Sequence, residues 1–249
     1  MHLPLDFALA VTFAVFVLGG MVKGLIGMGL PTIAMGLLAV IMPPAQAAAI
    51  LVVPSFVTNV WQLLAGPAFA GLVRRLWSMM AGVVAGTIAA SGVLAGEAAG
   101  IATGSLGAAL ILYGLVSLSG LRFRTPPRHE VWLSPLIGAA TGLVTGATGV
   151  FVIPAVPYLQ SLGLEKDDLI QALGLSFTVS TVALAAGLLR VDAFQPAYAG
   201  ISLLALVPAL AGMFAGQWIR ERISAETFRT VFFAGLLALG GYLLIHALV

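Results

Sequence analysis

The sequence predicts an all-α polytopic membrane protein made of two inverted repeats, each a broken-helix hairpin followed by three transmembrane helices. Composition is the first observation: 61% of the residues are hydrophobic, 8% are charged and the mean hydropathy is +1.12, which is far from the balance of a soluble domain. Second, charged residues divide the chain into uncharged runs, most of which match one crossing of about 20 residues. Third, a glycine-rich break occurs twice, as expected for an internal repeat.

The first predicted repeat covers residues 1–122 and opens with a long apolar segment, 7–41. Its two apolar arms, 7–20 and 31–41, would each be only about 16 to 21 Å long as helices, too short for a hydrocarbon core of about 30 Å. The stretch between them, MVKGLIGMGLPT, contains glycines, a proline and Lys23. We therefore predict a hairpin of two half-helices that meet at this break. Three spans follow, at about 44–66, 76–96 and 98–120.

The second predicted repeat, 123–249, has the same plan. Its hairpin covers 132–162, where two apolar arms flank VTGATGVFVIP, and the spans that follow are expected at about 168–189, 194–217 and 226–248. Three matches in the same order support the equivalence of the halves: VKGLIG at 22–27 with VTGATG at 144–149, SFVTNVWQLLAG at 55–66 with SFTVSTVALAAG at 176–187, and AALILYGLVSL at 108–118 with AGLLALGGYLL at 234–244.

Positively charged residues predict the orientation, because Lys and Arg accumulate in cytoplasmic loops. If each hairpin segment crosses once, six positive residues lie on one side and four on the other. If each segment returns, only Arg190 lies opposite the remaining nine, which are Arg74, Arg75, Arg122, Arg124, Arg128, Lys166, Arg220, Arg222 and Arg229. The returning arrangement is favoured. It gives each half an odd number of crossings, inverts the halves and places both termini outside the cytoplasm, in a protein of the cytoplasmic (inner) membrane.

The composition excludes several classes of function. With no Cys and three scattered histidines, His2, His129 and His246, the chain offers no thiol catalyst and no cluster of metal ligands. We therefore expect no metal and no cofactor. An intramembrane enzyme would need a nucleophile with a base, or acidic residues within the spans, so no catalytic residue is predicted. The net charge of +2 comes from loop arginines and not from a basic patch, so nucleic acid is not an expected partner.

The two breaks are the predicted substrate site. A broken helix leaves backbone N–H groups unpaired at the start of its second half, and these donors, with the positive end of the helix dipole, favour an anion. Lys23 is the only ionisable residue near the first break, and we predict that it attracts the anion. The other predicted site residues are Gly27, Gly29, Thr32, Thr148 and Gly149 in the breaks, and Ser55, Thr58, Asn59, Gln62, Ser176, Thr178, Ser180 and Thr181 on the following helices.

Each of these features also has a plainer interpretation. Ser and Thr hydroxyls often bond back to a carbonyl of their own helix, and Lys23 could extend its side chain to a membrane interface. Glycine pairs such as Gly82 with Gly86, and Gly212 with Gly216, are interpreted as small-residue contacts that let two helices approach closely.

The chain resembles the sulfite exporter TauE/SafE family, which includes membrane transporters of the toluenesulfonate uptake permease type. The resemblance covers nearly the whole chain, through GLIGMGLPTIAM followed by PPAQAAAILVVPSFVTNV, and GAATGLVTGATGVFVIPAVPYLQSLGL followed by ALGLSFTVSTVALAAG. It implies a transporter of small sulfur-containing anions such as sulfite and organosulfonates. The partners it implies are a small anionic substrate and the lipid bilayer.

The expected mechanism is alternating access, with one half rocking against the other about breaks at the bilayer midplane. Another anion, such as a carboxylate or a phosphorylated lipid carrier, stays open as the substrate. An anion channel is a further alternative, although it should show polar residues along a continuous path. The direction of transport, the coupling ion and assembly into a homo-oligomer also stay open.

Overall fold

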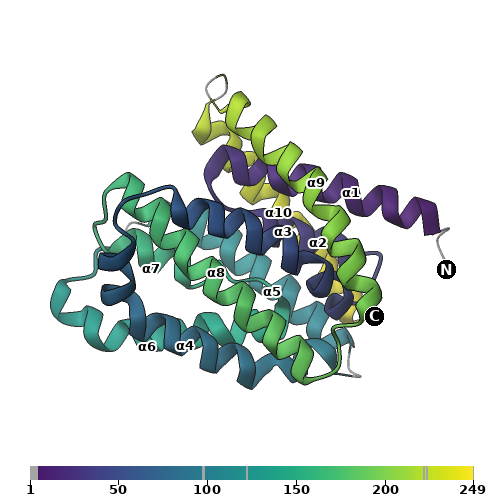
Figure 1. Cartoon of the computed structure of the whole chain (residues 1–249), viewed down its shortest axis with the longest axis horizontal. Coiled ribbons are helices and arrows are strands. Elements are labelled where there is room, and N and C mark those ends of the chain that lie inside the picture. Colours follow the sequence, from purple (N-terminus) through teal and green to yellow (C-terminus); the bar gives the residue numbers. More distant parts are fainter. Residues whose placement is uncertain (1–4, 97–98, 122, 221, 223, 249) are drawn as a thin grey trace.

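The computed structural model describes residues 5–96, 99–121, 123–220, 222 and 224–248, which form ten helices and no strand (Figure 1). In chain order the helices are α1 (Leu5–Ile26), α2 (Leu30–Leu38), α3 (Pro44–Leu64), α4 (Phe69–Ala95), α5 (Ala99–Leu118), α6 (Pro127–Thr148), α7 (Ala155–Ser161), α8 (Lys166–Arg190), α9 (Pro196–Ile219) and α10 (Ala225–Leu248). Eight of them, all except α2 and α7, are long and apolar enough to cross a membrane. The chain is therefore an integral, multi-pass, all-α membrane protein, as predicted.

The first arm of each hairpin is a full helix, which corrects the sequence prediction. Helices α1 and α6 each contain 22 residues and are about 33 Å long, so the prediction of two half-helices at 7–20 and 31–41 is wrong for the first arm. Only the second arms are short, with nine residues in α2 and seven in α7. Gly20 and Gly24 do not interrupt α1, because both pack directly against α9. Lys23 consequently lies in the last turn of α1 and not inside the break.

Both long arms end at a glycine in the left-handed conformation. Gly27 has a φ of 76° and Gly149 a φ of 72°, and these two residues occupy the same position in the matched stretches 22–27 and 144–149. Each glycine still donates its N–H to the carbonyl of the preceding turn, Gly27 to Lys23 and Gly149 to Thr145, at 2.7 Å in both cases. The positive φ then turns the chain out of the helix, which glycine permits at little cost.

After each break the chain folds back along the helix it has left. In the first hairpin, a Cβ added to Gly19 would lie 3.3 Å from the carbonyl oxygen of Leu30, and one added to Gly29 would lie 2.5 Å from Val22. In the second hairpin, the hydroxyl of Tyr158 in α7 hydrogen-bonds that of Ser134, near the start of α6, at 2.6 Å. Helices α2 and α7 therefore return toward the end at which α1 and α6 began.

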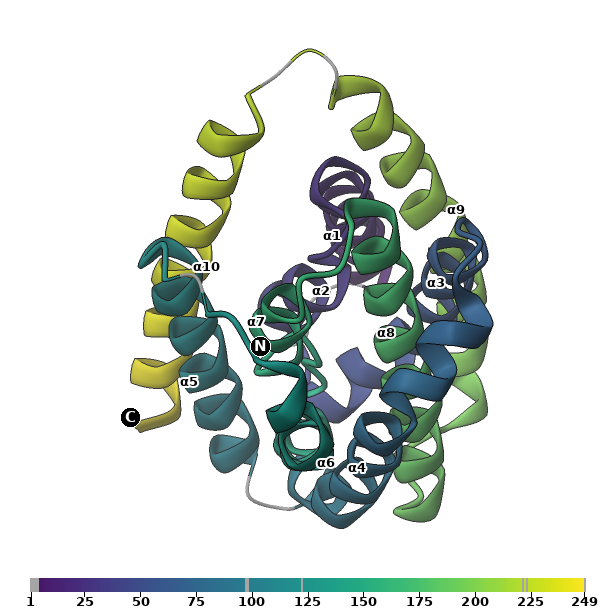
Figure 2. The same cartoon turned by 90° about the vertical axis from the view of Figure 1, so that its left-hand side faces the viewer.

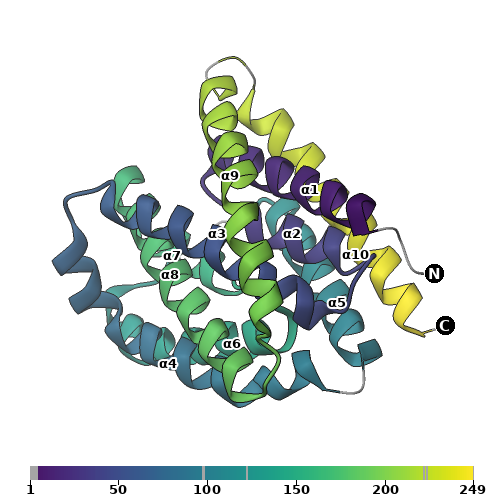
Figure 3. The ribbon, with the colours of Figure 1, turned by 45° about the vertical axis from the view of Figure 1, so that its right-hand side comes forward.

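The closest helix pairs each join one predicted half to the other. In Figure 2, α5 and α10 lie on the left, α4 and α6 at the bottom, and α3 and α9 on the right, around the central helices. Helices α1 and α9 run in parallel, because Gly20 faces Ala209 and Gly24 faces Met213. Helices α4 and α6 are also parallel; the contacts are Gly138 with Met79 and Gly142 with Val83. The crossing of α1 and α9 can be followed in Figure 3.

Two further pairs are antiparallel. In the α5–α10 pair, Gly107 faces Gly240 and Gly114 faces Leu237. In the α3–α8 pair, Asn59 Nδ2 donates to Thr181 Oγ1 at 3.3 Å, while Gln62 Nε2 donates to the carbonyl of Ile170 at 3.0 Å. Since a later residue on one helix meets an earlier residue on the other, the two helices of each pair run in opposite directions.

The glycines interpreted as packing residues do bring helices together. An added Cβ would lie 2.0–2.5 Å from a backbone oxygen of the neighbouring helix at each of Gly82, Gly86, Gly212 and Gly216. Real Cβ atoms are never found that close, so any side chain at these positions would force the helices apart. This interpretation is confirmed, and it means that the two predicted halves interlock through α1–α9 and α4–α6.

One end of the molecule gathers most of the positive charge. Helix α8 begins at Lys166 and ends at Arg190, which places these residues about 37 Å apart along the helix. Arg75 lies at the Lys166 end: it makes a two-point salt bridge to Glu130, at 2.9 and 2.6 Å, and donates to the carbonyl of Leu162 at 3.3 Å. Arg75 belongs to α4 because this helix begins at Phe69, earlier than the predicted span 76–96. Arg122 lies outside the described residues.

Candidate functional site

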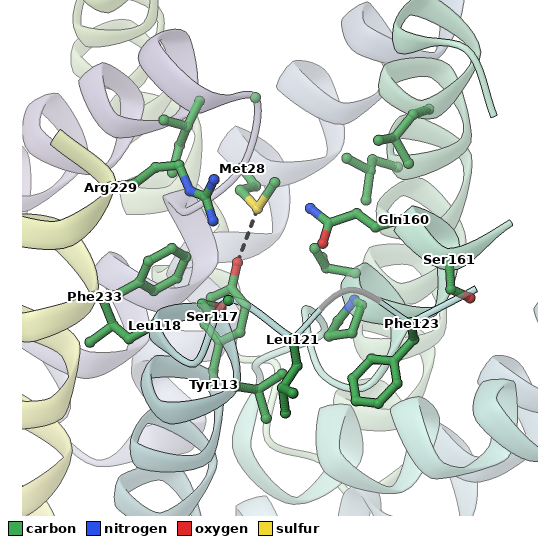
Figure 4. A pocket seen from close by; sticks show the side chains of 18 of the residues that line it. Met28, Tyr113, Ser117, Leu118, Leu121, Phe123, Gln160, Ser161, Arg229 and Phe233 are labelled. Atoms are coloured by element: carbon green, nitrogen blue, oxygen red, sulfur yellow. Dashed lines mark hydrogen bonds between the residues drawn. The ribbon is translucent and has the colours of Figure 1, made fainter. Parts of the chain in front are cut away.

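A cavity of about 1060 Å³ opens at the positively charged end and reaches the first helix break. Its inner wall is the segment Leu25–Met28, where α1 ends. The remaining walls come from the last turns of α5 with the connection that follows, from α7 with the first half of α8, from Arg220 at the end of α9, and from the beginning of α10. Figure 4 shows this cavity with Met28 facing Tyr113, Arg229 and Gln160. The break that the sequence indicated as a site therefore forms part of a real cavity.

Positive side chains dominate the charge of this cavity. Among the described residues that line it, Arg124, Lys166, Arg220 and Arg229 are cationic and only Glu226 is acidic. The four cations come from the α5–α6 connection, the start of α8, the end of α9 and the start of α10, which are far apart in sequence. A cavity lined by one sign of charge concentrates ions of the opposite sign. The geometry therefore suits an anion.

The first break also offers unpaired backbone donors. Among the described residues, the N–H groups of Met28, Gly29 and Thr32 make no hydrogen bond, whereas Ile33 N–H bonds to the carbonyl of Gly29 at 2.9 Å. Helix α2 begins at Leu30, so these donors lie at its N-terminus, where the helix dipole adds partial positive charge. Gly27 differs from the other break residues because its N–H is already bonded within α1.

Lys23 points into the protein and not toward a membrane interface. Only 4% of its surface is exposed, and its Nζ donates to Asn59 Oδ1. The same Nζ lies 6.0 Å from the centre of the Phe177 ring, and Asn59 also donates to Thr181. No acidic side chain pairs with Lys23 among the described residues. Three predicted site residues, Lys23, Asn59 and Thr181, are thus in one connected network of buried polar groups.

Gln62 lies one turn after Asn59 on α3, beside the first break. Its Nε2 would lie 3.9 Å from a Cβ added to Gly27, and the same nitrogen donates to the carbonyl of Ile170 on α8. Its Oε1 is buried and has no partner among the described residues. Gln62 is therefore next to the cavity wall and has an unused acceptor.

The predicted hydroxyls separate into two groups. The threonines all bond to carbonyls of their own segment, at 2.7 or 2.8 Å: Thr32 to Gly29, Thr58 to Pro54, Thr148 to Val144, Thr178 to Gly174 and Thr181 to Phe177. The serines do not: Ser55, Ser176 and Ser180 are buried with no hydrogen-bond partner among the described residues. The plainer interpretation thus applies to the threonines, and the serines are the hydroxyls with bonding capacity left for a ligand or water.

The second break is not part of the cavity. Gly149 and its neighbours up to Ile153 are buried, and no residue from 149 to 155 lines the cavity. A Cβ on Gly149 would lie 2.8 Å from the end of the Met35 side chain, so α2 covers this break. Phe177 lies between the two regions, since its ring is 5.3 Å from that of Phe151 and near Lys23. The two breaks approach a common aromatic side chain but do not share an open site.

Sequence reasoning missed the residues that give the cavity its charge. Arg124, Lys166, Arg220 and Arg229 were interpreted only as loop residues that orient the protein. Their predicted location on one side was the available signal, but nothing in the sequence showed that they surround a cavity. Tyr113, inside an apolar span, gave no signal at all.

Comparison with known proteins agrees with the sequence resemblance. A family model described as sulfite exporter TauE/SafE matches residues 12–243. Searches of curated proteins and of solved structures found no match. The matched range includes both breaks, all the predicted site residues and every described cation of the cavity. This chain therefore belongs to the sulfite exporter TauE/SafE family.

Proposed function

We propose that this protein is a secondary membrane transporter of small sulfur-containing anions, of the sulfite or organosulfonate class, that works by alternating access. One observation carries the proposal: a cavity with four cations and one acid ends at a helix break with unpaired N–H groups, close to a buried lysine. Family membership gives the class of substrate, since the family is described as sulfite exporters.

In this proposal an anion makes successive contacts, from the cations at the mouth of the cavity to the first break and Lys23. Exposed cations at the mouth attract it over several ångströms of water, because their fields add within the cavity. The N–H groups of Met28, Gly29 and Thr32 then replace part of its hydration, as helix N-termini commonly do for oxyanions.

Lys23 would provide the balancing charge, and Asn59 and Gln62 would be neutral contacts beside it. Ser55, Ser176 and Ser180 have unused bonding capacity for the anion or its water. In this proposal the second break, Thr148 and Gly149, becomes accessible only in the opposite state.

The directions of the helix pairs support two inverted halves, 1–122 and 123–249. If the segments 7–41 and 132–162 each crossed the membrane once, α3 and α8 would run in the same direction, and so would α5 and α10. Both pairs are antiparallel, as expected if each segment returns. In this arrangement the positively charged end faces the cytoplasm, the cavity opens there, and both termini lie outside.

The interlocked glycines limit which parts can move. Because α1–α9 and α4–α6 join the halves at backbone distance, simple rocking of one half against the other would disrupt tight contacts. We therefore place the movement in the α5–α10 pair, which forms one wall of the cavity, opposite α7 and α8. Movement of this wall would open or close the path to the first break.

A transport assay with a charge variant tests the proposal. Purified protein in liposomes should take up radiolabelled sulfite or methanesulfonate, and Lys23→Gln should weaken anion binding about tenfold or more, because a charge-assisted hydrogen bond is lost. Arg190→Gln, which changes a cation at the other end of α8, is the matched control and should leave binding unchanged. Equal affinity of folded Lys23→Gln and wild-type protein would remove Lys23 from the site.

The size of the cavity favours one second candidate, a phosphorylated lipid carrier. Its volume of about 1060 Å³ lies just above the range of about 300–1,000 Å³ that suits drug-sized ligands, and well above what one sulfite ion needs. Thermal stabilisation by a panel of anions separates the candidates, because a ligand that binds the folded state raises the melting temperature. Stabilisation by sulfonates and sulfite supports our proposal, whereas stabilisation by a prenyl phosphate alone would replace it.

A further inference from the structure

A buried tyrosine on the cavity wall has a poor hydrogen-bond partner. The hydroxyl of Tyr113 donates to the sulfur of Met28 at 3.0 Å (Figure 4). Only 1% of Tyr113 is exposed, and its ring packs edge-on against Phe233, with ring centres 5.1 Å apart. A thioether is a weak acceptor, and a buried hydroxyl without a good acceptor carries a desolvation cost. A stronger acceptor would therefore stabilise the Tyr113 hydroxyl more than the Met28 sulfur does.

Its partner, Met28, belongs to the first break. Met28 lies between Gly27 and Gly29, with φ values of 76° and 111°, so the backbone on both sides is in conformations that other residues rarely adopt. The residue is partly exposed to the cavity, as is the preceding Gly27. The Tyr113–Met28 contact thus links α5 to the break, across the path that an anion would take toward Lys23.

A cation lies on the same side of the cavity. Arg229 lines the cavity from α10, and in Figure 4 its guanidinium points toward the Tyr113–Met28 contact. No carboxylate lies within salt-bridge distance of Arg229 among the described residues. An anion held by this guanidinium would bring oxygen atoms toward the Tyr113 hydroxyl, and an anionic oxygen is a far better acceptor than sulfur.

We propose that Tyr113 is a hydrogen-bond donor to the transported oxyanion, and that the anion displaces Met28 as the acceptor of its hydroxyl. The exchange breaks one O–H···S hydrogen bond and forms one O–H···O hydrogen bond, with no covalent change. It releases Met28 from α5, which frees the break to move only when an anion is present. This inference rests on the proposed function, since it concerns the same cavity.

Two substitutions should change anion affinity in opposite directions. Tyr113→Phe keeps the ring against Phe233 but removes the donor, so the affinity for sulfite and methanesulfonate should fall about tenfold, as for a lost hydrogen bond to a charged group. Met28→Leu keeps the approximate volume but removes the competing acceptor, so affinity should rise about two- to threefold, because the contact given up is weak. In the Tyr113→Phe background, Met28→Leu should have no further effect on affinity.

Calorimetric titration of the detergent-purified full-length protein with each anion measures these affinities, and melting curves verify that each variant is folded. Tyr242→Phe, which changes an exposed tyrosine elsewhere on α10, is the control and should bind like the wild type. A general loss of packing would weaken binding in both single variants, so weaker binding by Met28→Leu overturns the inference. Unchanged affinity in Tyr113→Phe also overturns it while leaving the transporter proposal intact, whereas failure of the wild type to bind either anion overturns both.

Discussion

The two helix breaks begin with the same backbone turn but have opposite surroundings. Each follows a 22-residue helix that ends at a glycine with positive φ, Gly27 or Gly149. The first break then borders a cavity with positively charged walls. The second is covered by Met35 and followed by four apolar residues, Val150 to Ile153, of which none is more than 4% exposed. Equivalent sequence therefore fixes the backbone turn but not its access to water.

This difference is what we expect of the proposed alternating-access transporter in a state that is open to one side. If both breaks were open at once, the protein would leak, and if both were closed it would be occluded. Here the cavity reaches the first break from the end that carries Lys166, and the second break does not line it.

The largest expected difference between the two breaks is in their rates of thiol labelling. The chain contains no Cys, so single substitutions Met28→Cys and Val150→Cys each introduce one reporter. In detergent both faces of the protein are accessible. A hydrophilic maleimide should then label Met28→Cys about a hundredfold faster than Val150→Cys, if exposing position 150 costs about 2.8 kcal/mol of local opening. Labelling rates can be followed by mass spectrometry.

Two controls make the labelling result interpretable. Ser117→Cys, at another residue that lines the cavity, should react about as fast as Met28→Cys. After unfolding in a denaturing detergent, all three variants should react at similar rates, which shows that the folded protein protects position 150. Similar rates in the folded protein would mean that the second break is also open, contrary to the contrast drawn above.

Adding one methyl group to each glycine should refine the comparison. Gly27→Ala and Gly149→Ala introduce the same strain at similar φ, about 1–2 kcal/mol each. At position 27 the new Cβ has only Gln62 nearby, at 3.9 Å, but at position 149 it would meet Met35 at 2.8 Å. We expect Gly149→Ala to lower the melting temperature more, because overpacking adds about 1 kcal/mol or more. Gly241→Ala, a helical position with no neighbour within 4 Å, is the control; equal melting temperatures for the first two variants would contradict tight packing at the second break.

Much of the fold could be predicted from local patterns. Composition and the length of uncharged runs predicted an all-helical membrane protein, because the bilayer requires long apolar helices. The small-residue pairs Gly82 with Gly86 and Gly212 with Gly216 indicated close helix contacts, and this is confirmed. The position of the break was also predicted, because glycine and proline are common where a helix ends.

The lengths of the helical arms could not be predicted in this way. The first arm was predicted to end at Gly20, and Gly24 was predicted to lie in the break, because glycine weakens an isolated helix. In the protein, α9 packs directly on both glycines and keeps α1 helical up to Ile26. The contact that sets the length of α1 comes from residues nearly two hundred positions later in the chain, so a local sequence pattern does not reveal it.

The candidate site was predictable only where its residues belong to the repeat. Lys23, Asn59 and Thr181 were predicted, and the structure brings them together. The cations of the cavity come from separate connections and helix ends, and Tyr113 lies in an apolar span. Such residues form a cavity only after the helices have packed, so spacing along the sequence does not reveal them.

The smallest expected effect concerns the charge at the mouth of the cavity. Arg220 is exposed and lines the mouth, so Arg220→Gln should weaken anion binding only about two- to fivefold, as for other solvent-exposed charges. The loss should appear mainly in the association rate, measured by stopped-flow fluorescence, and should disappear at 1 M salt, where the screening length is about 3 Å. Arg190→Gln should change neither rate, because Arg190 does not line the cavity and lies at the opposite end of α8 from Lys166. A loss that persists at high salt would mean that Arg220 contacts the bound anion directly, and the site would then extend from the break to the mouth.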